Sequence, residues 1–192
     1  MNCVNLPSVK IDRRSTDTRQ RLIDITLDLI DSDGWHAVTL GGVAHACGVT
    51  TPACYKHFPS KTSLFEAAAH QLSASLGQRA DALIQDDPIE SLVGIGTLLV
   101  DLAAEHPRLF EFNQVSPAAV AAFDRLDEHP LLALTYGEVE RLATQRGTDP
   151  EPLHLLVWSC LQGYTQLIAA GATDADATFI RAALRAIVTI GD

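Results

Sequence analysis

The chain has 192 residues, of which 47% are hydrophobic and 20% are charged. This composition supports a folded core and excludes a wholly disordered chain, because disordered chains combine low hydrophobicity with high net charge. No apolar run approaches the roughly 18 residues that a membrane-spanning helix needs, and the N-terminus lacks the apolar core of a signal peptide. We therefore expect a cytoplasmic protein.

The net charge of −10 is unevenly distributed along the chain. In residues 1–70 the basic and acidic side chains balance, so residues 71–192 hold all of the excess negative charge. Between Gly34 and Phe65 there is no Asp or Glu, although this stretch carries two lysines and three histidines. Because carboxylates repel phosphate groups, their absence makes this stretch a candidate DNA-binding surface.

The N-terminal third is expected to be helical after a flexible basic arm at residues 1–14. A first helix is predicted over 15–32, because its apolar residues recur at intervals of three and four, and Gly34 follows it. A short second helix is predicted from the N-cap Thr39 to Cys47.

A tight turn and a third helix follow. Gly48 suits the turn because glycine adopts a positive φ without steric cost. Thr50 caps the next helix, Pro52 fits its first turn, and the helix stops before Pro59. Residues 15–59 therefore resemble a helix-turn-helix DNA-binding domain.

The remainder, residues 60–192, is predicted to form a larger helical domain. Ser60 caps a longer helix that extends to about Gln85, and prolines and glycines divide the rest into apolar-rich segments. The expected fold class is all-α, with a three-helix head followed by this larger domain. The segments expected after the longer helix are 88–105, 107–114, 116–127, 129–146, 151–171 and 174–190.

The sequence gives no sign of catalytic or metal chemistry. It contains no H-E-x-x-H, G-x-S-x-G or Walker pattern, and its four cysteines form no C-x-x-C pair, so we expect neither an enzyme nor a cofactor. Cys47 and Cys54 flank the predicted turn. Buried structural thiols are the expectation there, and a redox switch is the alternative.

The third helix, together with its flanks, carries groups that suit DNA binding. Tyr55 offers a phenolic hydroxyl, Lys56 a cation, and Lys61 lies in the first turn of the next helix, where free N–H groups attract anions. An ordinary helical corner without DNA binding is the alternative on spacing alone.

Residues 16–68 resemble the N-terminal domain of the TetR/AcrR family of regulators. The resemblance is carried by Thr18-Arg19, Leu22-Ile23, Gly34-Trp35, Val38-Thr39, Val43-Ala44, Cys47-Gly48-Val49-Thr50, Tyr55-Lys56-His57-Phe58, Pro59-Ser60-Lys61 and Leu64-Phe65. This chain departs from the family pattern in having Gly41 and Gly42 early in the second helix and Cys54 where leucine is usual. The recognition helix also has no arginine, which removes bidentate guanine readout by that residue.

The resemblance implies the DNA contacts and the type of function. It implies a ligand-responsive regulator of transcription, in most members a repressor, that binds a pseudo-palindromic operator as a homodimer. An activator of the same family is one alternative, and a helical module that binds protein and not DNA is another. The predicted contacts are Thr39, Tyr55, His57 and Lys61 to phosphates, Thr51, Pro52, Ala53 and Lys56 to bases, and the capping residue Thr50.

The resemblance also implies that residues 60–192 bind an effector and form the dimer. Because the available side chains are mainly apolar, we expect a small lipophilic effector. The candidate pocket residues are Phe110, Phe112, Phe123, Tyr136, Trp158 and Gln162. The candidate dimer-interface residues, on the last two helices, are Leu161, Gly163, Tyr164, Ile168, Phe179, Ala183, Leu184 and Ile187.

Overall fold

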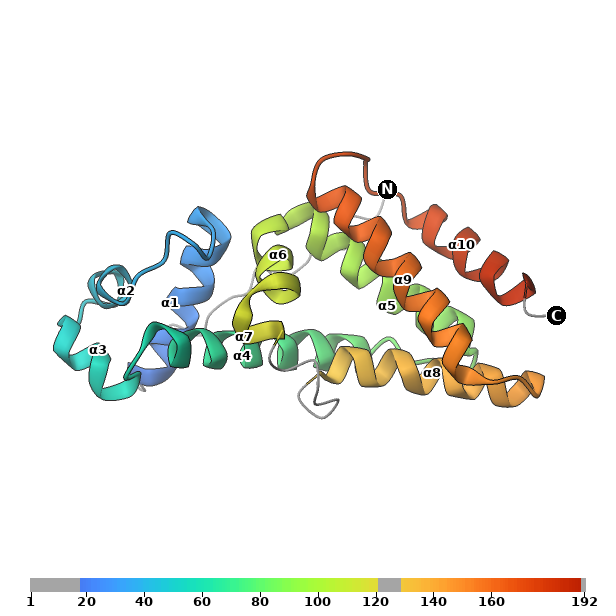
Figure 1. Ribbon diagram of the computed structural model, residues 1–192, viewed down its shortest axis with the longest axis horizontal. Coiled ribbons are helices and arrows are strands. Elements are labelled where there is room, and N and C mark those ends of the chain that lie inside the picture. The colour runs from blue at the N-terminus through green and yellow to red at the C-terminus, as the bar shows by residue number, and fades with distance from the viewer. Residues whose placement is uncertain (1–17, 121–128, 191–192) are drawn as a thin grey trace.

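The computed structural model describes residues 18–120 and 129–190, and its regular elements there are all α-helices (Figure 1). The expected all-α fold is therefore confirmed. The predicted arm at 1–14 and residues 121–127 of the predicted segment 116–127 lie outside the described residues. The helices are α1 (Thr18–Asp33), α2 (Leu40–Cys47), α3 (Thr51–His57), α4 (Lys61–Asp81), α5 (Pro88–Glu105), α6 (Pro107–Val115), α7 (Pro117–Val120), α8 (Pro130–Arg146), α9 (Pro150–Ala169) and α10 (Ala177–Ile190).

The boundaries of the short N-terminal helices come from local hydrogen bonds. The Thr39 hydroxyl accepts the N–H of Gly42 at 3.1 Å, and the Thr50 hydroxyl accepts that of Ala53 at 3.3 Å. Gly48 ends α2 with a φ of +71°, the left-handed conformation that favours glycine. These caps satisfy N–H groups that a helix start otherwise leaves unbonded. Because capping residues are recognisable in a sequence, the starts of both helices could be predicted from it.

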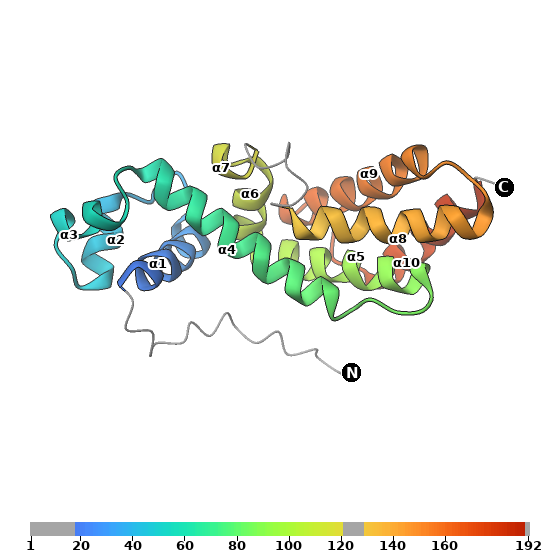
Figure 2. The same cartoon turned by 90° about the horizontal axis from the view of Figure 1, so that it is seen from below.

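Helix α4 connects two parts of the molecule. Helices α1, α2 and α3 form a small head at one end, and α5, α8, α9 and α10 pack together at the other (Figures 1 and 2). Helix α4 runs from the head along α8, and α6 and α7 lie between the two ends.

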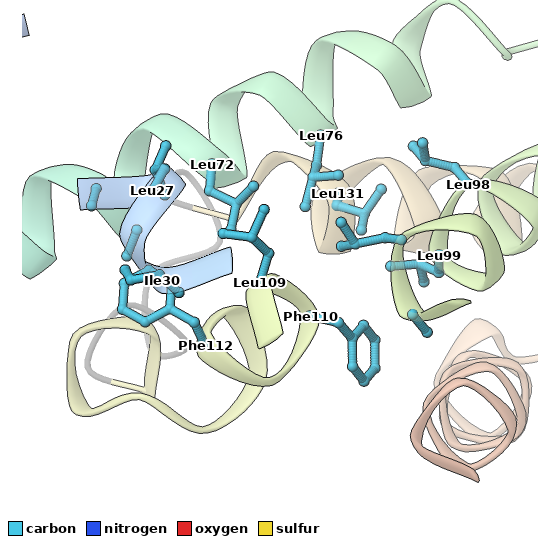
Figure 3. Close-up of a cluster of buried hydrophobic side chains, with 14 of the residues drawn as sticks. Leu27, Ile30, Leu72, Leu76, Leu98, Leu99, Leu109, Phe110, Phe112 and Leu131 are labelled. Carbon is cyan, nitrogen blue, oxygen red and sulfur yellow. The ribbon is translucent and has the colours of Figure 1, made fainter. Parts of the chain in front are cut away.

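The head and the body share one continuous hydrophobic core. Leu27 and Ile30 of α1 lie beside Leu72 of α4 and Leu109 of α6 (Figure 3). The ring of Phe65 on α4 meets that of Phe112 on α6 edge to face, with centroids 5.6 Å apart. Each such aromatic pair contributes about 0.5–1.5 kcal/mol beyond the burial of its area.

Two helix ends differ from the sequence prediction. Helix α4 stops at Asp81 and not near Gln85, because the chain turns there and the N–H of Leu83 bonds the carbonyl of Ala80 at 2.9 Å. Helix α10 starts at Ala177 and not at 174. The Tyr164 hydroxyl accepts the N–H of Asp176 at 2.8 Å and holds the preceding residues as a loop.

None of the helices described is both long enough and apolar enough to cross a membrane.

Candidate nucleic-acid interface

The exposed face of α3 carries most of the side chains predicted to touch DNA. Tyr55 is 50% exposed, and Lys56 and His57 beside it are also exposed. Cys54 and Phe58 point the other way and are buried in the head core, so the helix cannot rotate this face inward. Among the remaining predicted contacts, Thr39, Thr50, Thr51 and Pro52 are exposed, while Ala53 and Lys61 are half-buried.

The two capping threonines retain a hydrogen that they can donate. Thr39 and Thr50 use hydroxyl lone pairs to accept backbone N–H groups, which leaves each O–H group unassigned. A hydroxyl both accepts and donates, so each can donate to a phosphate oxygen without losing its cap. The cap and the predicted DNA contact are therefore compatible.

The N-terminus of α4 offers a second anion-binding feature beside α3. Ser60 and Ser63 form a reciprocal capping box, in which the Ser60 hydroxyl accepts the N–H of Ser63 at 3.0 Å. Lys61 lies in that first turn, with its ammonium 4.9 Å from the centroid of the Phe65 ring. This contact holds the charge close to the positive end of the helix dipole, where both attract phosphate.

Arg19 on α1 is a cationic group that the predicted contact set did not include. It is exposed, and its guanidinium carbon lies 5.0 Å from the centroid of the Phe58 ring at the end of α3. The Thr18-Arg19 pair of the family pattern was the only signal in the sequence, because the acid-free stretch begins at Gly34. The fold brings Arg19 to the same end of the molecule as the recognition helix.

Polar bonds hold the head helices in position. Arg21 on α1 donates to the carbonyl of Cys47 at 2.7 Å and so fixes the end of α2. Asp24 is buried, with 6% of its surface exposed, and accepts from the side-chain amides of Gln20 and Gln71, each at 2.8 Å. Gln71 belongs to α4, so this network ties the head to the connecting helix.

The two cysteines of the head are buried free thiols. Cys47 is 3% exposed and Cys54 is fully buried. Burial raises the pKa of the Cys54 thiol, and the nearby Cys47 adds to that increase. A raised pKa lowers the thiolate fraction, so Cys54 is poorly suited to thiol chemistry in the folded head.

Two of the candidate pocket residues line a common cavity in the body. Trp158 and Gln162 of α9 face a cavity of about 20 Å³ between α4, α6, α8 and α9. Phe110 and Phe112 are fully buried core residues outside its lining. Tyr136 does not line it either, since its ring packs on His154 at a centroid distance of 5.0 Å. Phe123 lies outside the described residues.

Three of the candidate dimer residues are interior in the single chain. Leu161 and Leu184 have 0% and 1% of their surface exposed, and Ile168 has 7%, so a partner cannot reach them in this conformation. The physical reason is that α5 covers this side of α9 and α10. Gly163 and Phe179 are exposed, and Tyr164, Ala183 and Ile187 are half-buried.

Comparison with known sequences finds a family match in the head. Residues 22–68 match the family described as "Bacterial regulatory proteins, tetR family". The nucleoid occlusion factor SlmA of Marinobacter nauticus is 28% identical over 148 residues, which cover 68% of this chain and 76% of that protein. Another protein of that name, from Photorhabdus laumondii, is matched over 56% of its own length.

Comparison with solved structures finds the same fold over nearly the whole chain. A protein of unknown function from Rhodococcus sp. RHA1 has a TM-score of 0.74 at 19% identity, with 94% of this chain and 98% of that chain covered. RolR, solved in complex with resorcinol, has a TM-score of 0.65 at 21% identity, with 91% and 87% covered. At these identities the likeness concerns the fold.

Proposed function

The chain belongs to the TetR family of DNA-binding transcriptional regulators, and on that premise we propose that it is a homodimeric repressor released from a pseudo-palindromic operator by a small molecule. The family consists of regulators and not of enzymes. The observation that carries the proposal is the exposed face of α3, which presents Tyr55, Lys56 and His57 from a stretch without a single carboxylate.

The proposed mode of binding places α3 in the major groove. Thr51, Pro52 and Ala53 at the start of this helix would meet base edges, where their methyl and methylene groups suit thymine methyls. The hydroxyl of Tyr55 and the ammonium of Lys61 would bind the backbone on either side. Because only Lys56 adds a cationic base contact, we expect an affinity dominated by phosphates and strongly dependent on salt.

Dimerisation is proposed through exposed apolar side chains on α9 and α10. Leu156, Gly163 and Leu167 lie one or more turns apart on the same exposed face of α9, and the leucines are 51% and 52% exposed. Phe179 of α10 is 45% exposed, and its ring lies 4.4 Å from that of Tyr164, measured between centroids. A second copy that covers this face would bury apolar surface at about 25 cal/mol per Å².

Gly163 supports the same face as the dimer interface. A Cβ atom at this position would meet nothing within 4 Å, so packing within the chain does not require glycine there. Glycine in a helix interior costs about 0.5–1 kcal/mol relative to alanine. Close approach of a helix from a second copy would explain why glycine occupies position 163.

Effector binding is proposed for the body, because the cavity at Trp158 and Gln162 lies against α4, the helix that leads to the head. The complex of RolR with resorcinol is an example of a small molecule held by a protein of this fold. Differential affinity of the ligand for two head spacings would shift the dimer away from its operator.

A second candidate function is nucleoid occlusion, which the names of the SlmA relatives favour. A repressor is expected to act at a few sites near promoters, and a wider distribution of bound sites along the chromosome would favour the second function. Mapping of bound sites in cells separates the two functions.

The experiment that tests the proposal is selection of bound duplexes from a random DNA pool. The expected result is a two-fold symmetric site whose half-sites lie about one helical turn apart, or a multiple of that, with affinity falling steeply with salt. Failure to enrich any sequence, or binding that does not respond to salt, would contradict the proposed operator binding.

A further inference from the structure

The body cavity has a lining that differs from the lipophilic one expected from the sequence. Five of its nine lining residues are polar, and each of these carries a hydrogen-bonding side chain. The polar residues are Ser73, Asn113, Gln114, His129 and Gln162, and the apolar ones are Leu76, Leu131, Leu132 and Trp158. Within the described part of the chain, no Asp, Glu, Lys or Arg reaches the cavity.

This lining selects ligands by charge. At a pH where His129 is neutral, a charged group moved from water into such a site loses its hydration and finds no opposite charge among the described lining residues. A neutral group with donors and acceptors can instead bond the amides of Asn113, Gln114 and Gln162, which offer both. Trp158 adds a flat apolar surface, and its indole stacks on the ring of His154 with 22° between the planes.

The cavity is too small in this conformation for an organic ligand. Its free volume of about 20 Å³ holds about one water molecule, whereas sites for small organic molecules have volumes of about 300–1,000 Å³. Leu76 on α4 and Leu131 on α8 both line it, and both belong to the hydrophobic cluster drawn in Figure 3. Binding therefore requires some of the lining helices α4, α6, α8 and α9 to separate.

The contact that holds α4 against α8 at this point depends on one glycine. A Cβ atom placed on Gly77 would overlap the Cβ of Pro130, and it would lie 3.2 Å from Cγ of the same ring. Gly77 follows Leu76 of the cavity lining directly, and Pro130 lies between His129 and Leu131, which also line it. Any added atom at Gly77 must therefore push the two helices apart beside the cavity.

Separation of these helices acts on the DNA-binding head through α4. This helix starts at Lys61, beside the recognition helix, and ends at Asp81, past the cavity. The network of Asp24 with Gln71, and the packing of Phe65, join its first half to the head. A displacement near Gly77 is thus passed to the head by a continuous helix.

We propose that this cavity is the effector site, that it takes a small, flat, uncharged molecule with hydrogen-bonding groups, and that the ligand enters by opening the Gly77–Pro130 contact. The inference rests on the proposed release of the operator by a small molecule. It adds the class of ligand, and it identifies Gly77 as the residue that permits the closed state.

The first test measures ligand class without DNA. The chain has two tryptophans, so the Trp35→Phe variant reports on Trp158 alone. Benzamide, benzoate and benzylamine are similar in size but neutral, anionic and cationic at neutral pH. We expect benzamide to change Trp158 emission in a saturable way, with benzoate and benzylamine at least about tenfold weaker. Equal binding of benzoate, or no binding of benzamide, would overturn the proposed ligand class; calorimetry on the unaltered chain repeats the test if Trp35→Phe is unstable.

The second test measures the Gly77 contact without ligand. We expect Gly77→Ala to weaken operator binding at least about tenfold, as an effector would. Gly137→Ala on α8 is the matched control, because a Cβ atom there meets nothing within 4 Å. Adding Pro130→Gly to Gly77→Ala removes the overlapping Cβ and should restore binding. A folded Gly77→Ala variant with full operator affinity would overturn the role of this contact.

The two tests separate the inference from the function on which it rests. If benzamide binds and Gln162→Leu weakens it, but neither benzamide nor Gly77→Ala affects operator affinity, the cavity assignment stands and release by an effector fails. If Gly77→Ala releases the operator while benzamide does not bind, the coupling stands and the ligand class is wrong.

Discussion

Nδ1 of His106 lies 2.7 Å from a carboxylate oxygen of Asp31, so the start of α6 is joined to the end of α1. Arg108, two residues further along and in the first turn of α6, donates to the backbone carbonyls of Asp31 and Ser32. These carbonyls lie in the last turn of α1, where a helix has no internal donors for them. The head is thus attached to the body at a second point besides α4.

The first prediction concerns this attachment. In a double-mutant cycle of Asp31→Ala and His106→Ala, we expect a coupling energy of about 0.5–1 kcal/mol, because both side chains are one-third exposed and water weakens the pair. Urea unfolding of the four proteins measures it. Asp33→Ala, an exposed acid on the same turn, serves as the control and should show no coupling to His106. Additive effects of the two substitutions would show that the contact contributes nothing.

The second prediction concerns the DNA contacts of the head. Lys61→Ala should lower the slope of log affinity against log salt by about one per head, because it removes one phosphate contact. Tyr55→Phe should cost about 1 kcal/mol per head through loss of its hydroxyl, on all DNA sequences alike. Lys56→Ala should in addition relax the sequence preference.

The control for these DNA contacts is Arg146→Ala. This substitution removes a positive charge at the end of α8, far from the head, and should leave the salt slope unchanged (Figure 1). Electrophoretic shifts at several salt concentrations measure all four variants. Unchanged affinity in both Tyr55→Phe and Lys61→Ala would contradict the proposed placement of α3 on the duplex.

The head could be predicted from the sequence because its signals are local. Thr39 and Thr50 cap helices and Gly48 forms a turn, and each of them bonds only to residues three or four positions away. Such local features can be recognised in the sequence. The acid-free stretch from Gly34 to Phe65 is likewise visible without a structure. Arg19 was missed because only the fold brings its guanidinium to the Phe58 ring.

The sequence allowed the body to be divided into helices, but it did not show which face of each helix is buried. Helix α9 is apolar on nearly all sides, so its sequence does not say that Leu161 packs inward and Leu167 outward. That depends on α5, which covers one side. The contact between Gly77 and Pro130 joins positions distant in the sequence, and neither residue type alone indicates it. Burial of this kind is a property of the neighbours and not of the segment.

The third prediction uses the two glycines at the start of α2. Gly41 is exposed and a Cβ atom there meets nothing, so Gly41→Ala should stabilise the head by about 0.5–1 kcal/mol. At Gly42 a Cβ atom would lie 3.2 Å from the Thr39 hydroxyl, so Gly42→Ala should gain less because it presses on the cap. Thermal unfolding compares the two.

The same variants test whether Gly41 serves DNA binding. The fold does not require glycine at this position. We therefore expect that Gly41 allows the α2 backbone to approach the duplex closely. Gly41→Ala should then bind the operator more weakly although it is more stable. A gain in stability with full affinity would show that the glycine has no role in binding.

The fourth prediction concerns the dimer. Leu167→Glu should convert the protein to monomers and reduce operator affinity, because it places a charge within the proposed apolar interface. Val115→Glu is a matched control, since Val115 at the end of α6 is 51% exposed and Leu167 is 52% exposed. Sedimentation measures the mass of each variant. A Leu167→Glu dimer with unchanged affinity would place the interface elsewhere.

The fifth prediction follows from His154 on α9. Burial lowers the pKa of its imidazole, and the nearby Glu151 opposes that shift only in part. The folded protein therefore takes up this proton at a lower pH than the unfolded chain, whose imidazole has the ordinary pKa of about 6.5. As the pH falls through that value the unfolded state gains the proton first, so the free energy of unfolding decreases until the pH passes the folded pKa.

His154→Gln removes this contribution to the pH dependence. We expect the variant to lose less stability than the unaltered protein between pH about 7.5 and about 5, measured by urea unfolding at both values. His70→Gln, which changes an exposed histidine of α4, is the comparison and should retain the full acid loss. If His154→Gln loses as much stability as His70→Gln, the half-buried imidazole of His154 is not the source of the acid sensitivity.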